Sequence, residues 1–295
     1  MHTITLEDSG ATSRLDVHTF GTGSPKVCFT AGVHGNEYGG IHVALRLMAF
    51  LAENPPPRGT VTIMPWCNPT ASRCRQRRSP FDSEDMNRIF PGNAEGSLSH
   101  KIAAALWQQT VQADYLVDLH CCGQHSAPYL LATFDEHPKA RALAERIPVP
   151  VLIRSEGTGG QMFTEACRQR DQAALIIEIP SGPGSGAIHK AATELVYAGL
   201  LSLLRTLGVI PGEPSGDAPL KCGPLRDADA PAPGFWEPLP ALQNGQPLEA
   251  GQLIGHVDGK AVHMPESGVI MAIRPSALIF RDDLWTVTYA QPVAQ

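Results

Sequence analysis

The chain has 295 residues, of which 43% are hydrophobic and 18% charged, and its formal net charge at pH 7 is -6. These values are typical of a globular protein with one large domain, or with a large and a small one, and they exclude a disordered or fibrous chain. The acidic balance offers no basic surface, so neither nucleic acid nor an anionic membrane is expected as a partner.

The first residues, 1–8, contain acidic side chains and lack the basic start and long apolar stretch of a signal peptide. No window holds the roughly 18 consecutive apolar residues that a membrane span needs. The seven cysteines are an odd number spread along the chain, which favours free thiols in a reducing compartment. We therefore expect a soluble, cytoplasmic protein.

Short apolar segments alternate with amphipathic ones up to residue 207, which predicts an α/β fold with a mixed, mostly parallel central sheet flanked by helices. The predicted strands are residues 26–31, 60–66, 115–120, 129–133, 149–153 and 174–179. The predicted helices are residues 41–53, 99–112, 138–146, 162–170 and 187–207. Proline ends the first helix, and Ser97 or Ser99 is the expected cap of the second. The strand ends carry their loops to one edge of the sheet, where open α/β proteins place their sites.

The composition changes after Gly208, where proline, glycine and acidic residues dominate. This change predicts an α/β domain over residues 1–211, followed by a linker and small β domain over residues 212–295. Asn244-Gly245 and Asp258-Gly259 predict tight hairpin turns.

The segments 245–255 and 265–270 resemble the barrel-sandwich modules of lipoyl and biotinyl carriers. Lys260 lacks the flanking residues of the modified lysine in such carriers. A structural role for this small, all-β, barrel-sandwich-like module is therefore expected.

Side chains of the types that bind metals lie at or just after the ends of two predicted strands. His34 and Glu37 follow the first strand in a glycine-rich loop, and His120 ends the third. Two imidazoles and one carboxylate are the protein ligands of a catalytic zinc that keeps its fourth position for water. Asp118, two residues before His120, is a candidate to support the ligands from outside or to lie at the rim of the site, with a solvent-facing strand acid as the alternative. The sequence thus indicates a zinc hydrolase.

Glu178 lies in a run that otherwise predicts a buried strand, 173–180. A carboxylate among apolar neighbours costs free energy unless it is paired, coordinated or close to a strand end. Partial burial would raise its pKa toward the range useful for proton transfer. The alternative is an outward-facing side chain, because Pro180 indicates that the strand is ending there.

The chain also resembles a known family over residues 26–182. The matching motifs, in order, are Gly32-x-His34-Gly35-Asn36-Glu37, Asn68-Pro69, Arg77, Asp85-Met86-Asn87-Arg88-x-Phe90-Pro91-Gly92, Asp118-Leu119-His120 and Ile177-Glu178. This set resembles the succinylglutamate desuccinylase/aspartoacylase family, which is similar in fold to the zinc carboxypeptidases.

The resemblance implies one Zn²⁺ per chain, bound by His34, Glu37 and His120. It also implies that Glu178 is the catalytic base, which takes a proton from water and delivers it to the leaving amine. Arg77 matches the arginine that polarises the scissile carbonyl; Arg78 is its neighbour, and the spacing favours Arg77.

Asn87 and Arg88 match the pair that grips a substrate carboxylate. A guanidinium suits such roles because it presents paired donors and keeps its charge.

The function implied is hydrolysis of the amide bond of an N-acyl amino acid or a similar small amide. One alternative is a zinc carboxypeptidase acting on peptides or peptidoglycan fragments, and another is a non-catalytic binding protein with a structural metal. The family's commoner residues are replaced at Cys121-Cys122 and in the segment 179–182, so the acyl group stays open. The oligomeric state, including a homo-oligomer, also stays open.

Overall fold

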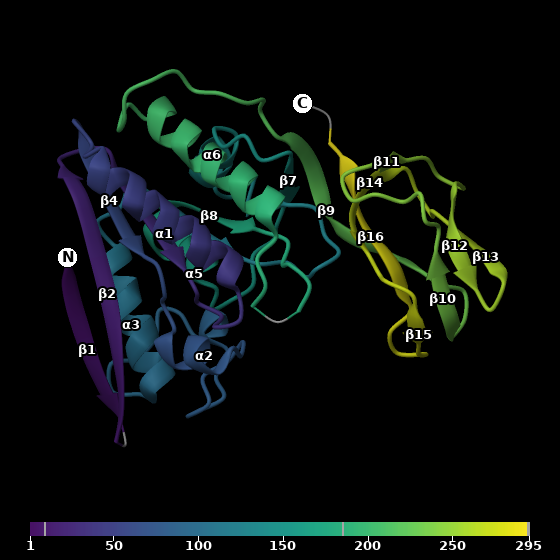
Figure 1. Ribbon diagram of the computed structural model, residues 1–295, viewed down its shortest axis with the longest axis horizontal. Coiled ribbons are helices and arrows are strands. Elements are labelled where there is room, and N and C mark those ends of the chain that lie inside the picture. The colour runs from purple at the N-terminus through teal and green to yellow at the C-terminus, as the bar shows by residue number, and fades with distance from the viewer. Residues whose placement is uncertain (9, 185, 294–295) are drawn as a thin grey trace.

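The structure, a computed structural model, describes residues 1–8, 10–184 and 186–293. One sheet of 12 strands runs through the whole molecule, with helices on both faces of its N-terminal part (Figure 1). Its strands in spatial order are β1 (His2–Asp8), β2 (Ala11–Thr22), β4 (Gly59–Met64), β3 (Lys26–Ala31), β5 (Tyr115–His120), β8 (Ala173–Glu178), β6 (Tyr129–Ala132), β7 (Val151–Arg154), β9 (Leu220–Asp229), β16 (Trp285–Pro292), β14 (Gly268–Ile273) and β11 (Pro247–Leu248).

The centre of this sheet is parallel, as predicted. Strands β4, β3, β5 and β8 run in one direction, whereas β2 and β6 are antiparallel to their neighbours β4 and β8. The sheet is therefore mixed, and the carboxyl ends of its four central strands meet at one edge.

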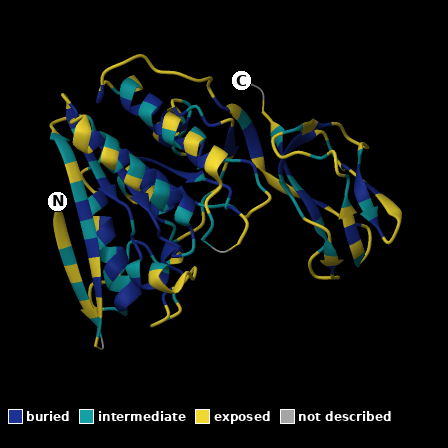
Figure 2. Ribbon diagram, viewed as in Figure 1, coloured by how far each residue is buried: buried dark blue, intermediate teal, exposed yellow. Residues whose placement is uncertain are grey.

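Helices cover the two faces of the central strands. α1 (Tyr38–Glu53) and α6 (Lys190–Thr206) lie against each other on one face, whereas α3 (Leu98–Thr110) and α5 (Met162–Arg170) cover the other. The remaining helices are α2 (Pro69–Cys74), the 3₁₀ helix η1 (Met86–Arg88) and α4 (Pro138–Ala144). Figure 2 shows the buried residues concentrated in the strands between these helices.

The alternation of side chains along β5 separates two cores. Val117 and Leu119 pack toward α1 and α6, whereas Leu116 packs toward α3 and α5. The same alternation sends Asp118 and His120 to the face of Leu116. The carboxylate and the imidazole of this strand therefore share one face and lie next to each other.

The predicted central strands and the five longer helices are present within a few residues of their predicted bounds. The sequence analysis missed β1 and β2, which lie at the edge of the sheet and carry polar residues on their exposed positions. It also missed α2 and η1, because six and three residues are too short to show a helical period.

Ser97, one of the two predicted caps of α3, is confirmed as its N-cap residue, but the capping bond does not come from its side chain. The carboxylate of Asp82 takes over that role: it accepts hydrogen bonds from the Ser99 backbone N–H at 2.9 Å and from the Ser97 and Ser99 hydroxyls at 2.8 and 2.9 Å. The cap thus comes from a loop 17 residues away from Ser99, which no local motif could reveal.

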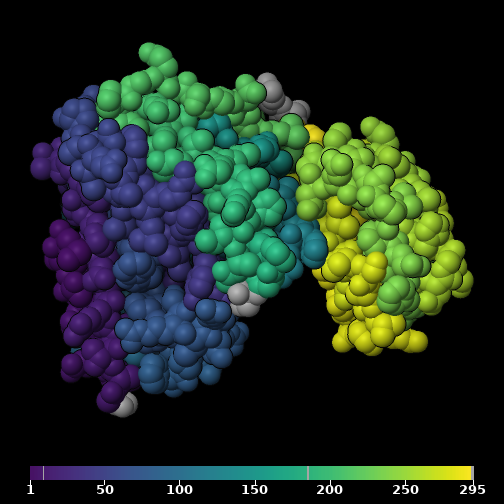
Figure 3. Space-filling model, viewed as in Figure 1, coloured from purple at the N-terminus to yellow at the C-terminus, as the bar shows by residue number. Residues whose placement is uncertain are grey.

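The C-terminal part contains strands and no helix within its described residues, 212–293. Besides the last strands of the large sheet it has a sheet of four strands, ordered β13 (Lys260–His263), β12 (Leu253–Val257), β10 (Gly234–Pro238) and β15 (Ala277–Ile279). This part forms a distinct lobe in the space-filling view (Figure 3) and has its own core around Trp236. The large sheet nevertheless continues into the lobe, because β9 pairs with both β7 and β16.

One of the two predicted hairpins is confirmed. Asp258 and Gly259 both have positive φ, 48° and 75°, and join β12 to β13 as a tight turn. The hairpin predicted at Asn244-Gly245 is wrong, because the strands on either side of it, β10 and β11, belong to different sheets.

No helix in the described part of the chain is long and apolar enough to cross a membrane. The seven cysteines are free thiols, four of them buried.

We expect Asp82→Ala to destabilise the fold by about 1–2 kcal/mol at pH 7, since it removes the cap of α3. Burial of Asp82 opposes its charged form, but the hydrogen bonds from Ser99 and Ser97 outweigh this and lower its pKa. The stabilisation is therefore present above the unfolded pKa of about 3.9 and is lost as the pH falls below it. Urea unfolding at pH 7 and pH 3 measures the loss of stability and its dependence on pH. Glu84→Gln, a change in the same loop, is the control. An equal loss for the two variants would contradict the capping role.

Candidate active site

The predicted site residues meet at the carboxyl edge of the central strands. His34 and Glu37 lie in the loop between β3 and α1, His120 is the last residue of β5, and Glu178 is the last residue of β8. β3 and β8 are the two neighbours of β5, and His120 and Glu178 are direct partners in the register of β5 and β8. Parallel pairing thus brings residues that are far apart in sequence to one place.

The three predicted ligands converge. The Nδ1 atoms of His34 and His120 are 3.2 Å apart. Glu37 lies between them, with Oε1 2.7 Å from His34 Nδ1 and Oε2 3.0 Å from His120 Nδ1. The three side chains are buried, and their ligand atoms all lie within 4.8 Å of one another. The Cys121 backbone N–H also donates to Glu37 Oε2 at 2.9 Å, which fixes the carboxylate.

A buried carboxylate holds the far side of each imidazole. His34 Nε2 is 3.1 Å from Asp85 Oδ1, and His120 Nε2 is 2.8 Å from Asp118 Oδ2. Asp118 is itself held by the Thr30 hydroxyl, which donates to its Oδ1 at 2.7 Å. Since a carboxylate accepts the proton of Nε2, each Nδ1 keeps its lone pair for a metal.

This donor set fits a zinc ion. Two imidazole nitrogens and one carboxylate, with an open fourth position, are a common catalytic zinc set. Four carboxyl groups, those of Glu37, Asp85, Asp118 and Glu178, surround the imidazole pair, and the nearby guanidinium of Arg77 offsets only one of them. The excess of formal negative charge favours a divalent cation at the place where the ligand atoms converge.

Of the two neighbouring arginines, Arg77 faces the ligands. Its Nε and NH2 groups donate to Asp85 Oδ2 at 3.0 and 2.9 Å, and its NH1 group is 3.7 Å from Glu37 Oε1. The side chain keeps 43% of its surface exposed, so the guanidinium lies at the boundary between the site and solvent. Arg78 instead donates to the backbone oxygen of Ser83.

The predicted carboxylate-binding pair is divided between the interior and the surface. Asn87 is buried: its Oδ1 accepts from the Met162 N–H at 3.0 Å, and its Nδ2 is 3.4 Å from His120 Nε2. Arg88 is exposed, and one guanidinium nitrogen donates to the Asn87 backbone oxygen at 2.8 Å. In this arrangement Asn87 contacts a metal-ligand candidate directly, whereas the remaining donors of Arg88 are available to a substrate.

Glu178 is partly buried at the end of β8. Burial raises its pKa to about 7; the carboxylates of Glu37 and Asp118 act in the same direction, and the His120 imidazole opposes them. A carboxyl group with a pKa near neutrality can both accept and return a proton.

Two glycines allow the loops of the site to pack closely. A Cβ on Gly35 would lie 2.1 Å from the backbone carbon of Ala71, so glycine lets α2 lie directly on the loop of His34. Gly160 has a φ of +77°, and a Cβ there would lie 2.0 Å from the Arg88 backbone oxygen. Glycine at these two positions holds α2 and η1 against the site.

The succinylglutamate desuccinylase/aspartoacylase catalytic domain family matches residues 23–207, more than half of the chain. The chain belongs to this family. The matched region contains the three converging ligands together with Arg77, Asn87, Arg88 and Glu178.

Two curated members show related sequences. The N-alpha-acetyl-L-2,4-diaminobutyric acid deacetylase of Halomonas elongata is 29% identical over 258 residues, which are 83% of this chain and 72% of the relative. The succinylglutamate desuccinylase of Ectopseudomonas mendocina is 26% identical over 250 residues, 76% of this chain and 71% of the relative.

Solved structures of the family share the fold over almost the whole chain. An aspartoacylase family protein from Mesorhizobium loti superposes with a TM-score of 0.81 at 24% identity, covering 99% of this chain and 94% of the other. An ectoine utilization protein from Ruegeria pomeroyi, in its product-bound structure, gives 0.78 at 23% identity, with 99% and 94% covered. The C-terminal lobe is therefore part of the shared fold.

Asp85 was not predicted as a site residue, although it is the first residue of the motif 85–92. Asp85 contacts His34, Arg77 and the Asn87 backbone N–H, the last at 3.1 Å. Burial opposes its charged form, but His34 and Arg77 outweigh this and hold the pKa of Asp85 well below its usual range. Its position two residues before Asn87, in a motif rich in polar residues, was the available signal.

We expect Asp85→Asn to weaken metal binding by about 10–100-fold, because the variant loses the charge that orients His34. Competition with a zinc-binding dye measures the affinity. Glu84→Gln, which neutralises the preceding carboxylate in the same loop, is the matched control. Equal zinc affinity in Asp85→Asn and the control would show that Asp85 does not support the ligand.

Proposed function

We propose that this protein is a zinc-dependent deacylase that hydrolyses the amide bond of an N-acyl amino acid or a similar small amide. The observation that carries the proposal is the convergence of the His34 and His120 Nδ1 atoms and the Glu37 carboxylate beside Glu178. His34, Glu37 and His120 would hold the zinc ion, which would supply a Lewis acid for the amide carbonyl and make the attacking water more acidic.

Glu178 is the proposed general base and acid. It lies on the strand next to His120 and on the same face of the sheet, so its carboxylate faces the converging ligands. With a raised pKa it accepts a proton from the attacking water and returns that proton to the nitrogen of the leaving amine. The amine then departs as a neutral group, which closes the proton balance of the hydrolysis.

Arg77 is the proposed oxyanion group. Asp85 fixes its guanidinium on one side by the Nε and NH2 bonds, and NH1 points toward Glu37. A fixed cation at this place stabilises the negative charge that develops on the amide oxygen, and it needs little reorganisation. Arg88, the exposed last residue of η1, provides donors for the carboxylate of the amino acid.

The curated relatives favour an amino acid amide as the substrate class. Their names describe a deacetylase of diaminobutyric acid and a desuccinylase of succinylglutamate, which share an N-acylated amino acid. The acyl groups of the two substrates differ, and in this chain Cys121 and Cys122 directly follow His120. We therefore propose which bond is cleaved, the amide bond, and which part of the substrate is shared, the amino acid; experiment must identify the acyl group.

A substrate panel tests the proposal. Zinc-loaded protein is incubated with acetyl, succinyl and aspartyl-type amides of amino acids, and in parallel with C-terminal peptides and peptidoglycan fragments; the released amine is quantified. We expect turnover of at least one N-acyl amino acid. Turnover of peptides alone would replace the deacylase with a carboxypeptidase, and no turnover at full zinc occupancy would favour a binding protein.

We expect Glu178→Gln to keep one zinc per chain and to lose at least 100-fold in kcat, because the amide cannot carry the proton. Metal analysis and initial rates on the best substrate of the panel measure the two effects. Turnover close to wild type in this variant would remove Glu178 as the base.

We expect Arg77→Ala to lower kcat by about two to three orders of magnitude, the usual effect of removing one oxyanion donor. Arg78→Ala is the matched control: among residues 1–8, 10–184 and 186–293, Arg78 bonds only the Ser83 backbone, so this variant is expected to stay within threefold of wild type. The opposite ranking of the two variants would assign the role to Arg78.

The acid limb of kcat/KM is expected above about pH 5, whereas an ordinary glutamate titrates near 4.3. Burial raises the pKa of Glu178, and the charge of a bound zinc ion pulls it back down from about 7. The base is active only when ionised, so activity falls as the pH drops through this range. Zinc content at each pH controls for metal loss. Constant activity down to pH 4.5 would contradict the assignment.

A further inference from the structure

A second cavity lies beside the site just described and shares none of its predicted metal ligands. It has a volume of about 840 Å³ and lies between β2, α1 and α2, with Ile188 at its rim. This volume is in the range of small-molecule sites in proteins. His34, Glu37 and His120 do not line it.

One wall of this groove is apolar. Ile41 and Leu45 lie one turn apart on the outer side of α1, and Trp66 and Ile188 complete the wall. Leu45 and Ile188 each keep 37% of their surface exposed, although both are large hydrophobic residues. An exposed apolar wall of this kind gains free energy when a nonpolar group covers it.

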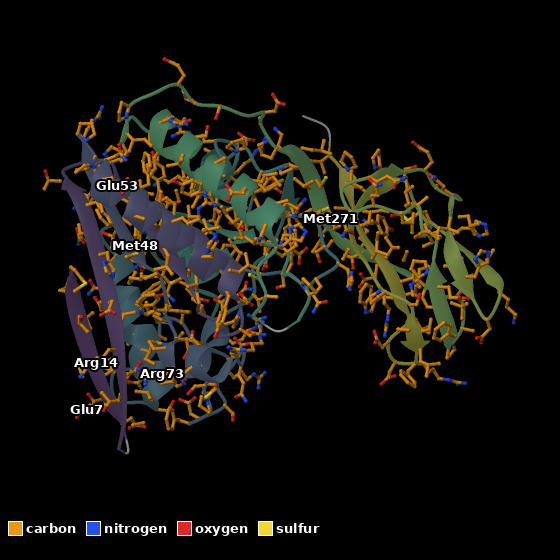
Figure 4. The ribbon with its side chains drawn as sticks, in the orientation of Figure 1. Glu7, Arg14, Met48, Glu53, Arg73 and Met271 are labelled. Atoms are coloured by element: carbon orange, nitrogen blue, oxygen red, sulfur yellow. The ribbon has the colours of Figure 1, made fainter. Side chains whose placement is uncertain are left out.

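The opposite wall carries positive charge. Ser13, Leu15 and Val17 are buried on one face of β2, so alternation turns Arg14 to the other face, toward the groove. Arg73 reaches the groove from α2, and the labelled side chains of Arg14 and Arg73 lie in the same region of the molecule (Figure 4).

Neither Arg14 nor Arg73 has an ion-pair or side-chain hydrogen-bond partner among the described residues. The groove's own acid, Asp16, is already engaged, because it accepts from the Thr3 hydroxyl at 2.6 Å and lies 3.4 Å from Trp66 Nε1. Two unpaired guanidinium groups in a chain with a net charge of -6 are thus available to an anion.

The floor of the groove also holds an unused polar group. The Ser72 hydroxyl is buried and has no hydrogen-bond partner among the described residues. The Ser72 backbone oxygen accepts from the Tyr38 hydroxyl at 2.8 Å, and Tyr38 directly follows Glu37. The groove therefore reaches the segment that carries a predicted metal ligand, while its lining includes none of the three predicted ligands.

We propose that this groove is a second small-molecule site, which binds an organic monocarboxylate with an apolar body. The carboxylate pairs with Arg14 and Arg73, and the nonpolar part covers Ile41, Leu45 and Ile188. Inorganic anions would satisfy the arginines but leave the apolar wall in water. The proposal does not depend on the deacylase reaction.

Isothermal titration calorimetry on the zinc-loaded full chain tests this with three probes. Hexanoate carries both features, acetate has the charge without the chain, and hexylamine has the chain with the opposite charge. We expect saturable binding of hexanoate, at least tenfold weaker binding of acetate because its apolar part is missing, and no binding of hexylamine. Absence of saturable hexanoate binding, or equal binding of hexylamine, would overturn the proposal.

Variants locate the binding. Arg14→Ala/Arg73→Ala is expected to weaken hexanoate at least tenfold, and Arg73→Glu alone to weaken it as well. Both arginines are exposed, so the variants should fold, and thermal melting checks this. Lys260→Ala/Arg281→Ala, which removes two exposed charges from the C-terminal lobe, should leave the affinity unchanged. An equal loss of hexanoate affinity in both double variants would indicate only a general effect of charge and would overturn the proposed site.

A carboxylate could also bind at the predicted metal site, and His120→Ala separates the two places. We expect hexanoate to bind this variant as it binds the wild type, because the groove contains none of the predicted ligands. Binding that disappears in His120→Ala and survives in Arg14→Ala/Arg73→Ala would assign the anion to the metal site and remove the groove. Either outcome leaves the substrate panel to decide the deacylase proposal independently.

Discussion

Carboxylates buried at the edge of the central sheet must find hydrogen-bond partners there, and this requirement shapes the surrounding loops. Asp118 carries a carboxyl group and lies in β5 between the fully buried residues Val117 and Leu119. Its burial is tolerated because Thr30 and His120 each form a hydrogen bond with one of its two oxygens. The Glu37 carboxylate accepts from the Cys121 N–H and lies 2.7 and 3.0 Å from the Nδ1 atoms of His34 and His120. The contacts of Asp85 and Asp118 with the two Nε2 atoms orient the imidazoles toward the predicted metal position.

The fold meets this constraint with its parallel strands. β3, β5 and β8 end at one edge, so loops that are distant in sequence present their polar groups to each other and not to the apolar cores. The supporting elements approach through glycine, with α2 against Gly35 and η1 against Gly160. Arg77 and Asn87, which lie between these two contacts in the chain, are thereby brought close to the imidazoles.

The C-terminal lobe is an extension of the same sheet as well as a unit with its own core. Met271, labelled in Figure 4 at the junction of the two parts, packs in a small core with Tyr129 of β6. Tyr129 is in turn the register partner of Glu178. The lobe is thus linked by packing to the strand that carries the proposed base, which gives it a structural role beside the site.

The α/β alternation, the ends of the central strands and the predicted ligand residues could be deduced from the amino-acid sequence, because they follow from local periodicity and from residue chemistry. The folded structure alone established that Asp82 caps α3, that Asp85 joins His34 to Arg77, and that Asn87 turns inward to His120 while Arg88 stays outside. It also decided that Asn244-Gly245 connects two sheets and does not close a hairpin. The same cause applies in each case. A buried polar group or a strand edge is satisfied by a hydrogen-bond partner that is far away in the chain. Local sequence patterns do not indicate which distant residue that partner is.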